Sequence, residues 1–178
     1  MHVRTARPAA GEYAPFYAGY VARVPDGDIV ATLRAQAEDT VRLLERVGEA
    51  GAGCAYAPGK WTIREVVGHL CDGERIFGAR ALRFARGDPS PLPGFDEKAY
   101  VPAGEFEART LASLIIELRA IRAATVALFD GLPDAAWMRT GTANETPVSV
   151  RALAWITAGH ERHHRLLLEE RYLPALSR

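Results

Sequence analysis

A chain of 178 residues, 48% apolar and 25% charged, is long enough to bury the core of one domain without disulfide bonds or other staples. Lys and Arg together number 22, as do Asp and Glu, so the net charge of zero excludes a general attraction to nucleic acid or to an anionic membrane. Charges interrupt every apolar run before the roughly 20 residues of a membrane span. The two cysteines make no disulfide framework, and the N-terminal stretch has no unbroken apolar region of a signal peptide. We therefore expect a reduced, cytoplasmic protein.

The first two predicted helices cover residues 28–48 and 61–87. Apolar residues in each recur at intervals of three and four, which is typical of an amphipathic helix. Asp28 is the expected N-cap of the first helix, because its carboxylate can accept hydrogen bonds from the first free amides. In the second helix, Thr62 and Glu65 have the spacing of a capping box, in which each side chain satisfies one backbone amide.

The other two predicted helices cover residues 110–132 and 149–173. Thr110 and Ser149 are their expected N-caps. We expect the last helix to end before Pro174, which lacks the amide that continues a helix.

Four long helices, without the clean alternation that indicates strands and hairpins, predict an all-α fold, a four-helix bundle. We expect a single domain over residues 1–178, with its packed core at about 28–173. The connection between the second and third helices, residues 87–105, contains four prolines and three glycines. A loop of this length in a compact domain is commonly functional, so we expect it to border the site as a lid. The connection 133–147 is expected to hold a short helical turn at "PDAAW".

Three of the five histidines fall within the string "GHERHHR". At about 100° per residue, His160 and His164 lie near the centre of the apolar face of the last helix, and His163 lies at its edge. Imidazoles at positions i and i+4 can ligate one metal ion. His69 lies on an apolar stripe of the second helix and is the expected third ligand, and Gly73 one turn later would allow the two helices to approach closely.

The alternative for these histidines is a hydrogen-bonded role in the core, since HxxxH pairs also occur by chance. Three unpaired imidazoles would be costly to bury, however, and one shared cation would satisfy them all. His2 lies at a terminus that we expect to be frayed. Cys71, two residues after His69, is turned about 160° away on the helix and is not expected to join the site.

Other polar residues near the histidines have competing interpretations. Arg80, Arg83 and Arg86 recur every three residues and form either a solvated basic face, which we favour, or a strip that binds an acidic thiol. Glu161 is turned about 100° from the preceding histidine, so the sequence identifies no general base and no catalytic residue. We expect the three tryptophans to pack in the bundle.

Residues 60–101 and 151–173 resemble the DinB-like family of small bacterial four-helix proteins. The two stretches contain both histidine-bearing helices, and the order and length of the other helices extend the resemblance from about residue 28. It implies a divalent metal ion, zinc or nickel, bound by one histidine of the second helix and an HxxxH pair of the fourth. Carried onto this chain, these ligands are His69, His160 and His164.

An open coordination position on such a metal distinguishes a catalytic site from a structural one. The resemblance implies a thiol-dependent S-transferase, in which the metal holds a low-molecular-weight thiol as its thiolate for attack on a small electrophile. Metal-dependent hydrolysis and a non-catalytic module for binding or stress response are the alternatives. The resemblance also implies a homodimer that acts on a small molecule. From the balanced charge and the lack of a spanning segment, we expect no binding to nucleic acid or membrane.

Overall fold

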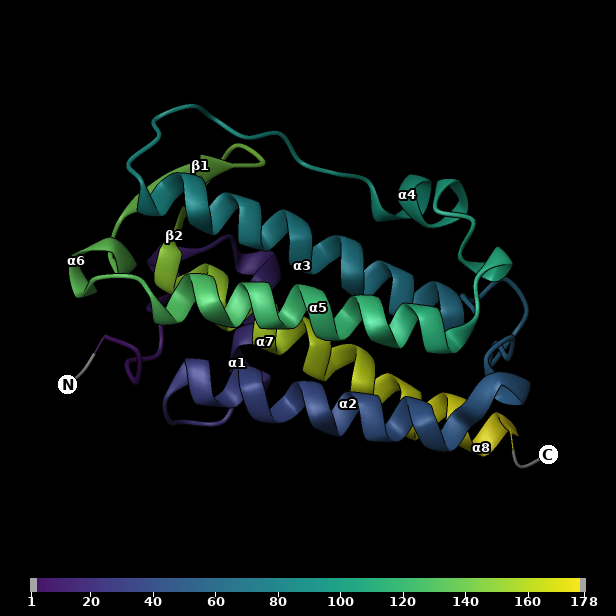
Figure 1. Cartoon of the computed structure of the whole chain (residues 1–178). Helices are drawn as coiled ribbons and strands as arrows, with labels where there is room; N and C mark the ends of the chain where they lie inside the picture. The colour runs from purple at the N-terminus through teal and green to yellow at the C-terminus, as the bar shows by residue number, and fades with distance from the viewer. Residues whose placement is uncertain (1–2, 177–178) are drawn as a thin grey trace.

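The structure, a computed structural model, describes residues 3–176 and is dominated by four long helices lying side by side (Figure 1). These are α2 (Ile29–Gly51), α3 (Ile63–Ala85), α5 (Leu111–Asp130) and α7 (Val150–Leu167). α3 packs against α5 and α7, and α2 packs against the same two helices, which closes the bundle. The predicted all-α bundle is confirmed.

The N-caps of the four long helices are the residues that the sequence predicts. The side chains of Asp28, Thr110 and Ser149 each accept a hydrogen bond from a backbone amide in the first turn. Thr62 and Glu65 form the reciprocal capping box. Each cap satisfies an amide that the helix itself leaves unpaired, so these four boundaries follow from local chemistry.

The end of the last long helix differs from the prediction. α7 continues into a π-helical turn (Leu168–Tyr172) and then into α8 (Leu173–Leu176), so it does not stop before Pro174. Pro174 lies within this continued stretch as the second residue of α8. In α2, Gly48 has a φ of 65° and interrupts the helix near its expected end, although helical structure resumes to the end of α2.

Several short elements connect and flank the bundle. A helix that the sequence analysis missed, α1 (Ala18–Arg23), packs against α7. The predicted turn at "PDAAW" is present as α6 (Asp134–Trp137). The remaining short elements are the 3₁₀ turns Ala10–Glu12, Pro15–Tyr17 and Phe106–Ala108, the helix α4 (Glu97–Ala103), and the strands β1 (Thr140–Ala143) and β2 (Thr146–Ser149).

The two strands form an antiparallel hairpin, which the sequence analysis did not expect. Asn144 and Glu145 connect them with positive φ angles of 49° and 61°, as a tight hairpin turn of the I′ type requires. Leu92 from the α3–α5 connection pairs with this hairpin, accepting from Asn144 and donating to Thr142, both at 2.9 Å. The connection is therefore no uninterrupted loop: it is tied to the hairpin, runs along α3 and then forms α4 (Figure 1).

The core consists of two apolar clusters, one towards each end of the bundle. The cluster near the hairpin includes Leu33, Phe77, Phe129 and Trp155, and the other includes Val41, Leu70, Leu118 and Leu168. On every long helix, buried polar residues occupy the positions between the two clusters: Gln36, Thr40, Glu74, Arg122, His160, Glu161 and His164. We call these residues, together with His69, the polar layer. In residues 3–176, no helix has the length and apolar character needed to cross a membrane.

Candidate metal centre

The structure brings His69, His160 and His164 together, as the sequence predicts. One ring nitrogen from each lies within 4.8 Å of those of the other two. The Nε2 atoms of His69 and His160 are 2.9 Å apart. All three side chains are buried, with residue exposures between 5% and 7%. His163 is only half-buried and packs against Tyr20, which matches its predicted place at the edge of the face. His2 lies outside the described residues.

Close contact between α3 and α7 depends on Gly73. A Cβ atom at this position would lie 3.0 Å from Cε1 of His160, closer than ordinary carbon contacts allow. The absence of a side chain therefore lets the His160 ring lie against α3 beside His69. This is the close approach that the spacing of His69 and Gly73 predicts.

Burial sets the protonation state of the histidine group. It lowers the pKa of His69 to about 4, although the negative charge of Glu97 raises it. Burial and the neighbouring imidazoles hold the pKa values of His160 and His164 well below their ordinary range. At neutral pH all three rings are therefore uncharged and have lone pairs available.

The residues present fit a divalent metal ion. Three neutral imidazoles are a donor set that zinc and nickel accept, and a three-histidine set leaves at least one coordination position for another group. The buried Nδ1 of His164 has no hydrogen-bond partner within residues 3–176, so the protein leaves the lone pair or proton of this nitrogen unpaired. Cys71 is buried in an apolar cluster and outside the histidine group, as expected, and burial raises the pKa of its thiol.

Aromatic rings surround the histidines. Trp61 packs at the edge of one core cluster, as predicted for the tryptophans, and also lies against His69 with 4.9 Å between ring centroids. Tyr20 and Phe77 lie edge-on to His160 at 5.5 and 5.6 Å. Tyr20 comes from α1, so the helix that the sequence analysis missed contributes one wall of the site.

A recess of about 300 Å³ opens onto His69 and His160. Gly94 and Phe95 of the α3–α5 connection line it, so this segment lies beside the histidines; a role as a lid stays a prediction. The other residues that line the recess are Ala14, Phe16, Tyr17, Tyr20, Phe77, Arg80, Glu97 and Asn144. A second recess of about 340 Å³ is lined by His164 together with Tyr56, Gly59, Lys60, Trp61, Val66, Lys98, Leu167 and Tyr172.

The three periodic arginines do not form the uniform solvated face that we predicted. Arg80 is only 5% exposed, donates to the carbonyl of Pro93 at 2.8 Å and lines the first recess. Arg83 is half-exposed and pairs with Asp88 at 2.6 Å. Arg86 alone is exposed. The difference arises because the connection after α3 folds back over Arg80 and covers it.

A buried ion network lies beside the histidines in the polar layer. Arg122 of α5 pairs with Glu74 through two bonds of 2.7 Å and with Glu161 at 2.6 Å. Thr40 and Gln36 donate to Glu161 at 2.6 and 2.5 Å. Burial lowers the pKa of Arg122, but the two carboxylates outweigh it and hold that pKa above its ordinary value. The sequence analysis missed this network. A signal was available, because Arg122 lies four residues from the apolar Leu118 and four from Val126, which places it on the same inward face of the helix.

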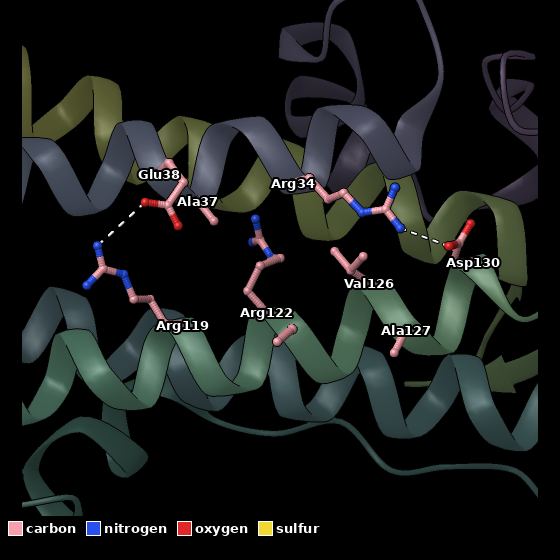
Figure 2. Close-up of a pocket in the computed structure, with 9 residues that line it drawn as sticks. Arg34, Ala37, Glu38, Arg119, Arg122, Val126, Ala127 and Asp130 are labelled. Atoms are coloured by element: carbon pink, nitrogen blue, oxygen red, sulfur yellow. Dashed lines mark hydrogen bonds and ion pairs between the residues drawn. The ribbon is translucent and has the colours of Figure 1, made fainter.

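The surface next to this network is a groove between α2 and α5 of about 550 Å³ (Figure 2). Arg34 pairs with Asp130 at 2.8 Å towards one end and Arg119 approaches Glu38 at 3.5 Å towards the other, while Arg122 stands between the two helices (Figure 2). None of the residues that line this groove is a histidine. It is thus separate from the histidine group despite being larger than either recess there.

The fold and the histidine group together define a helical-bundle protein whose centre could hold a metal ion. The chain belongs to the DinB superfamily, whose family model matches residues 32–168.

Two solved structures share the fold. One is YfiT from Bacillus subtilis, described as "a probable metal-dependent hydrolase with an unusual four-helix bundle topology". It is 19% identical, with a TM-score of 0.69, and the match covers 93% of this chain and 94% of that one. The other is the mycothiol-dependent maleylpyruvate isomerase, 13% identical, with a TM-score of 0.66 over 78% of this chain and 58% of that one. No curated protein matches the chain in sequence.

Proposed function

We propose that the protein is a metal-dependent S-transferase that joins a low-molecular-weight thiol to a small electrophile, with zinc or nickel bound by His69, His160 and His164. One observation carries the proposal: the histidine group faces two recesses, since His69 and His160 line one and His164 lines the other. A reaction between two molecules needs space for both beside the reacting centre.

A divalent cation in this site would supply the positive charge that keeps a thiol sulfur as its thiolate near neutral pH. The chain provides the surroundings for that charge. Neutral imidazoles leave the charge of the cation undiminished, which favours an anionic partner. The rings of Trp61, Tyr20 and Phe77 exclude water, and electrostatic attraction is stronger where water is excluded.

The charges around the second recess support a thiol there. Lys60 and Lys98 line it beside His164 and would attract the acidic groups of a thiol cofactor. Another protein with this fold, the mycothiol-dependent maleylpyruvate isomerase, depends on a thiol according to its name. The first recess, with its aromatic walls, is then the place for the electrophile.

Metal-dependent hydrolysis is the second candidate function, and Glu97 is the observation that favours it. Its side chain lines the recess with His69 and His160, and its charge acts on His69. A carboxylate in that position could accept a proton from an attacking water molecule. YfiT, described as a probable hydrolase, is similar over nearly the whole of this chain.

The test is an assay of untagged protein loaded with zinc or with nickel. A panel of bacterial low-molecular-weight thiols is combined with an epoxide or a chloro-aromatic electrophile, and ester and amide substrates are supplied without thiol. We expect conjugation that disappears in His160→Ala and persists in His163→Ala. Hydrolysis without a thiol that is lost in Glu97→Gln would replace the transferase with the hydrolase. Inactivity in every assay would favour a non-catalytic module.

We also propose a cytoplasmic homodimer, as the resemblance to DinB-like proteins implies. The measurement is the mass of the untagged protein by light scattering after gel filtration. A single mass of about 39 kDa, twice the 19.4 kDa of one chain, supports it. The monomer mass would refute it.

A further inference from the structure

Arg80 is a buried cation with few partners. Its residue is 5% exposed, and its guanidinium makes one hydrogen bond, to the carbonyl of Pro93 at 2.8 Å. Within residues 3–176 it forms no ion pair. Arg122 is equally buried but pairs with Glu74 and Glu161. A guanidinium has five N–H donors, and only Nη2 of Arg80 is bonded to the described part of the protein. Its other nitrogens are not among the fully buried unpaired atoms, so they remain available to a ligand in the recess that Arg80 lines.

The guanidinium of Arg80 thus has free donors in the recess that His69 and His160 also line. A volume of about 300 Å³ suits a small molecule. A carboxylate is the group that matches the planar fork of an arginine, because it can accept two parallel N–H bonds. Arg80 therefore provides the place for an anionic group in a cavity that already opens onto the histidines.

The rest of the recess restricts what the anionic group is attached to. Five of its twelve lining residues are Phe or Tyr: Phe16, Tyr17, Tyr20, Phe77 and Phe95. Such rings favour an apolar or aromatic body. Glu97 is the other charged residue of the lining and would repel a second carboxylate. The lining thus matches a single negative charge on an apolar molecule.

We propose that the substrate of the first recess is a small aromatic or apolar monocarboxylate, whose carboxylate binds Arg80 while its body lies along the aromatic walls towards the histidines. The part of this proposal that concerns a reaction rests on the proposed function, whereas the binding of the carboxylate does not. Arg80 acts as a specificity residue and is no metal ligand.

The test is calorimetric titration of the full chain, zinc-loaded and metal-free, with phenylacetate and with the neutral isostere phenylacetamide. We expect phenylacetate to bind on the order of 10- to 100-fold more tightly than the amide in both forms, which corresponds to a charge-assisted bidentate contact. Arg80→Gln should abolish this difference and retain zinc. Arg83→Gln is the matched control, because Arg83 lies on the same helix but does not line the recess, and it should bind as the unchanged protein does.

Several results would overturn the proposal. Equal affinity for the acid and the amide would do so in the unchanged protein, even if Arg80→Gln failed to fold. Phenylacetate binding that survives in Arg80→Gln but is lost without zinc would assign the carboxylate to the metal. Tighter binding of L-malate than of phenylacetate would exclude the apolar body. If phenylacetate binds through Arg80 but no thiol conjugation or hydrolysis is found, the proposed function fails while this inference stands.

Discussion

The Nε2 atoms of His69 and His160, from two different helices, lie 2.9 Å apart. Two ring nitrogens at this distance can share only one proton, and burial keeps both rings uncharged. With His164 beside them, the arrangement concentrates nitrogen lone pairs in a region that water barely reaches. Such a concentration of acceptors is stabilised by a cation.

The first prediction therefore concerns metal content. Changing His69, His160 or His164 to Ala should lower zinc affinity by on the order of 100-fold or more, since even the loss of groups that only orient ligands costs 10- to 100-fold. His163→Ala should retain the metal, because His163 lies outside the group. Elemental analysis of untagged protein measures both effects. If His163→Ala loses the metal and His164→Ala keeps it, the ligand assignment is wrong.

The second prediction concerns stability on metal removal. An ion that binds only the folded chain raises the free energy of unfolding by about 2.7 kcal/mol at a free concentration 100 times its dissociation constant. We expect zinc to raise the thermal midpoint and a chelator to reverse the change. His164→Ala should show a much smaller response at the same zinc concentration, because its affinity is expected to be on the order of 100-fold weaker. A midpoint that is insensitive to zinc in the unchanged protein would contradict metal binding in the folded bundle.

The third prediction concerns the buried ion network. Arg122→Met should lower the free energy of unfolding by about 3 to 5 kcal/mol, because Glu74 and Glu161 would stay buried without their partner. The control is Arg119→Met, one turn away on α5, where an exposed arginine makes only long contacts of 3.5 Å. Its effect should stay within about 1 kcal/mol. Urea denaturation measures both, and effects of similar size would show that the network contributes no more than a surface pair.

The fourth prediction compares two helical glycines. A Cβ atom at Gly159 would lie 2.2 Å from the carbonyl oxygen of Tyr20, so Gly159→Ala must push α1 away from α7. We expect a loss of about 1 to 3 kcal/mol, as for other overpacking substitutions. Gly78→Ala meets nothing closer than 3.9 Å and should gain roughly 0.5 to 1 kcal/mol from the better helix propensity of alanine.

Thermal or urea unfolding of the two glycine variants checks this comparison. Since Tyr20 packs against His160, we also expect Gly159→Ala to make the recess more open to solvent. Equal stability of the two variants would mean that α1 is not held against α7.

Local and periodic features could be predicted from the sequence. Asp28 and Thr110 cap helices through amides only a few residues away, and the inward position of His160 and His164 follows from the helical period. Features that depend on contacts between distant segments could not. Arg80 is buried because a segment beyond the end of its own helix folds over it.

The same limit explains two other differences. A helix of six residues, such as the one that carries Tyr20, is too short to show a periodic pattern, and its position depends on packing against α7. The hairpin contains only four residues in each strand, and Pro147 within it argues against a strand on sequence alone. Tertiary contacts therefore decide the walls of the site, while the local sequence decides which histidines point into it.

The polar layer also determines how the helices can align. Sliding α7 by one turn, about 5.4 Å, would separate Glu161 from Arg122 and leave the carboxylate of Glu161 buried without its cation, while Arg122 would keep Glu74. The same slide would carry His160 away from Gly73, whose lack of a side chain lets the ring lie close to α3. Helices that met only through apolar side chains would tolerate such a shift far better, because each leucine would find another apolar side chain to pack against. The buried polar residues around the candidate metal centre therefore also fix the register of the bundle.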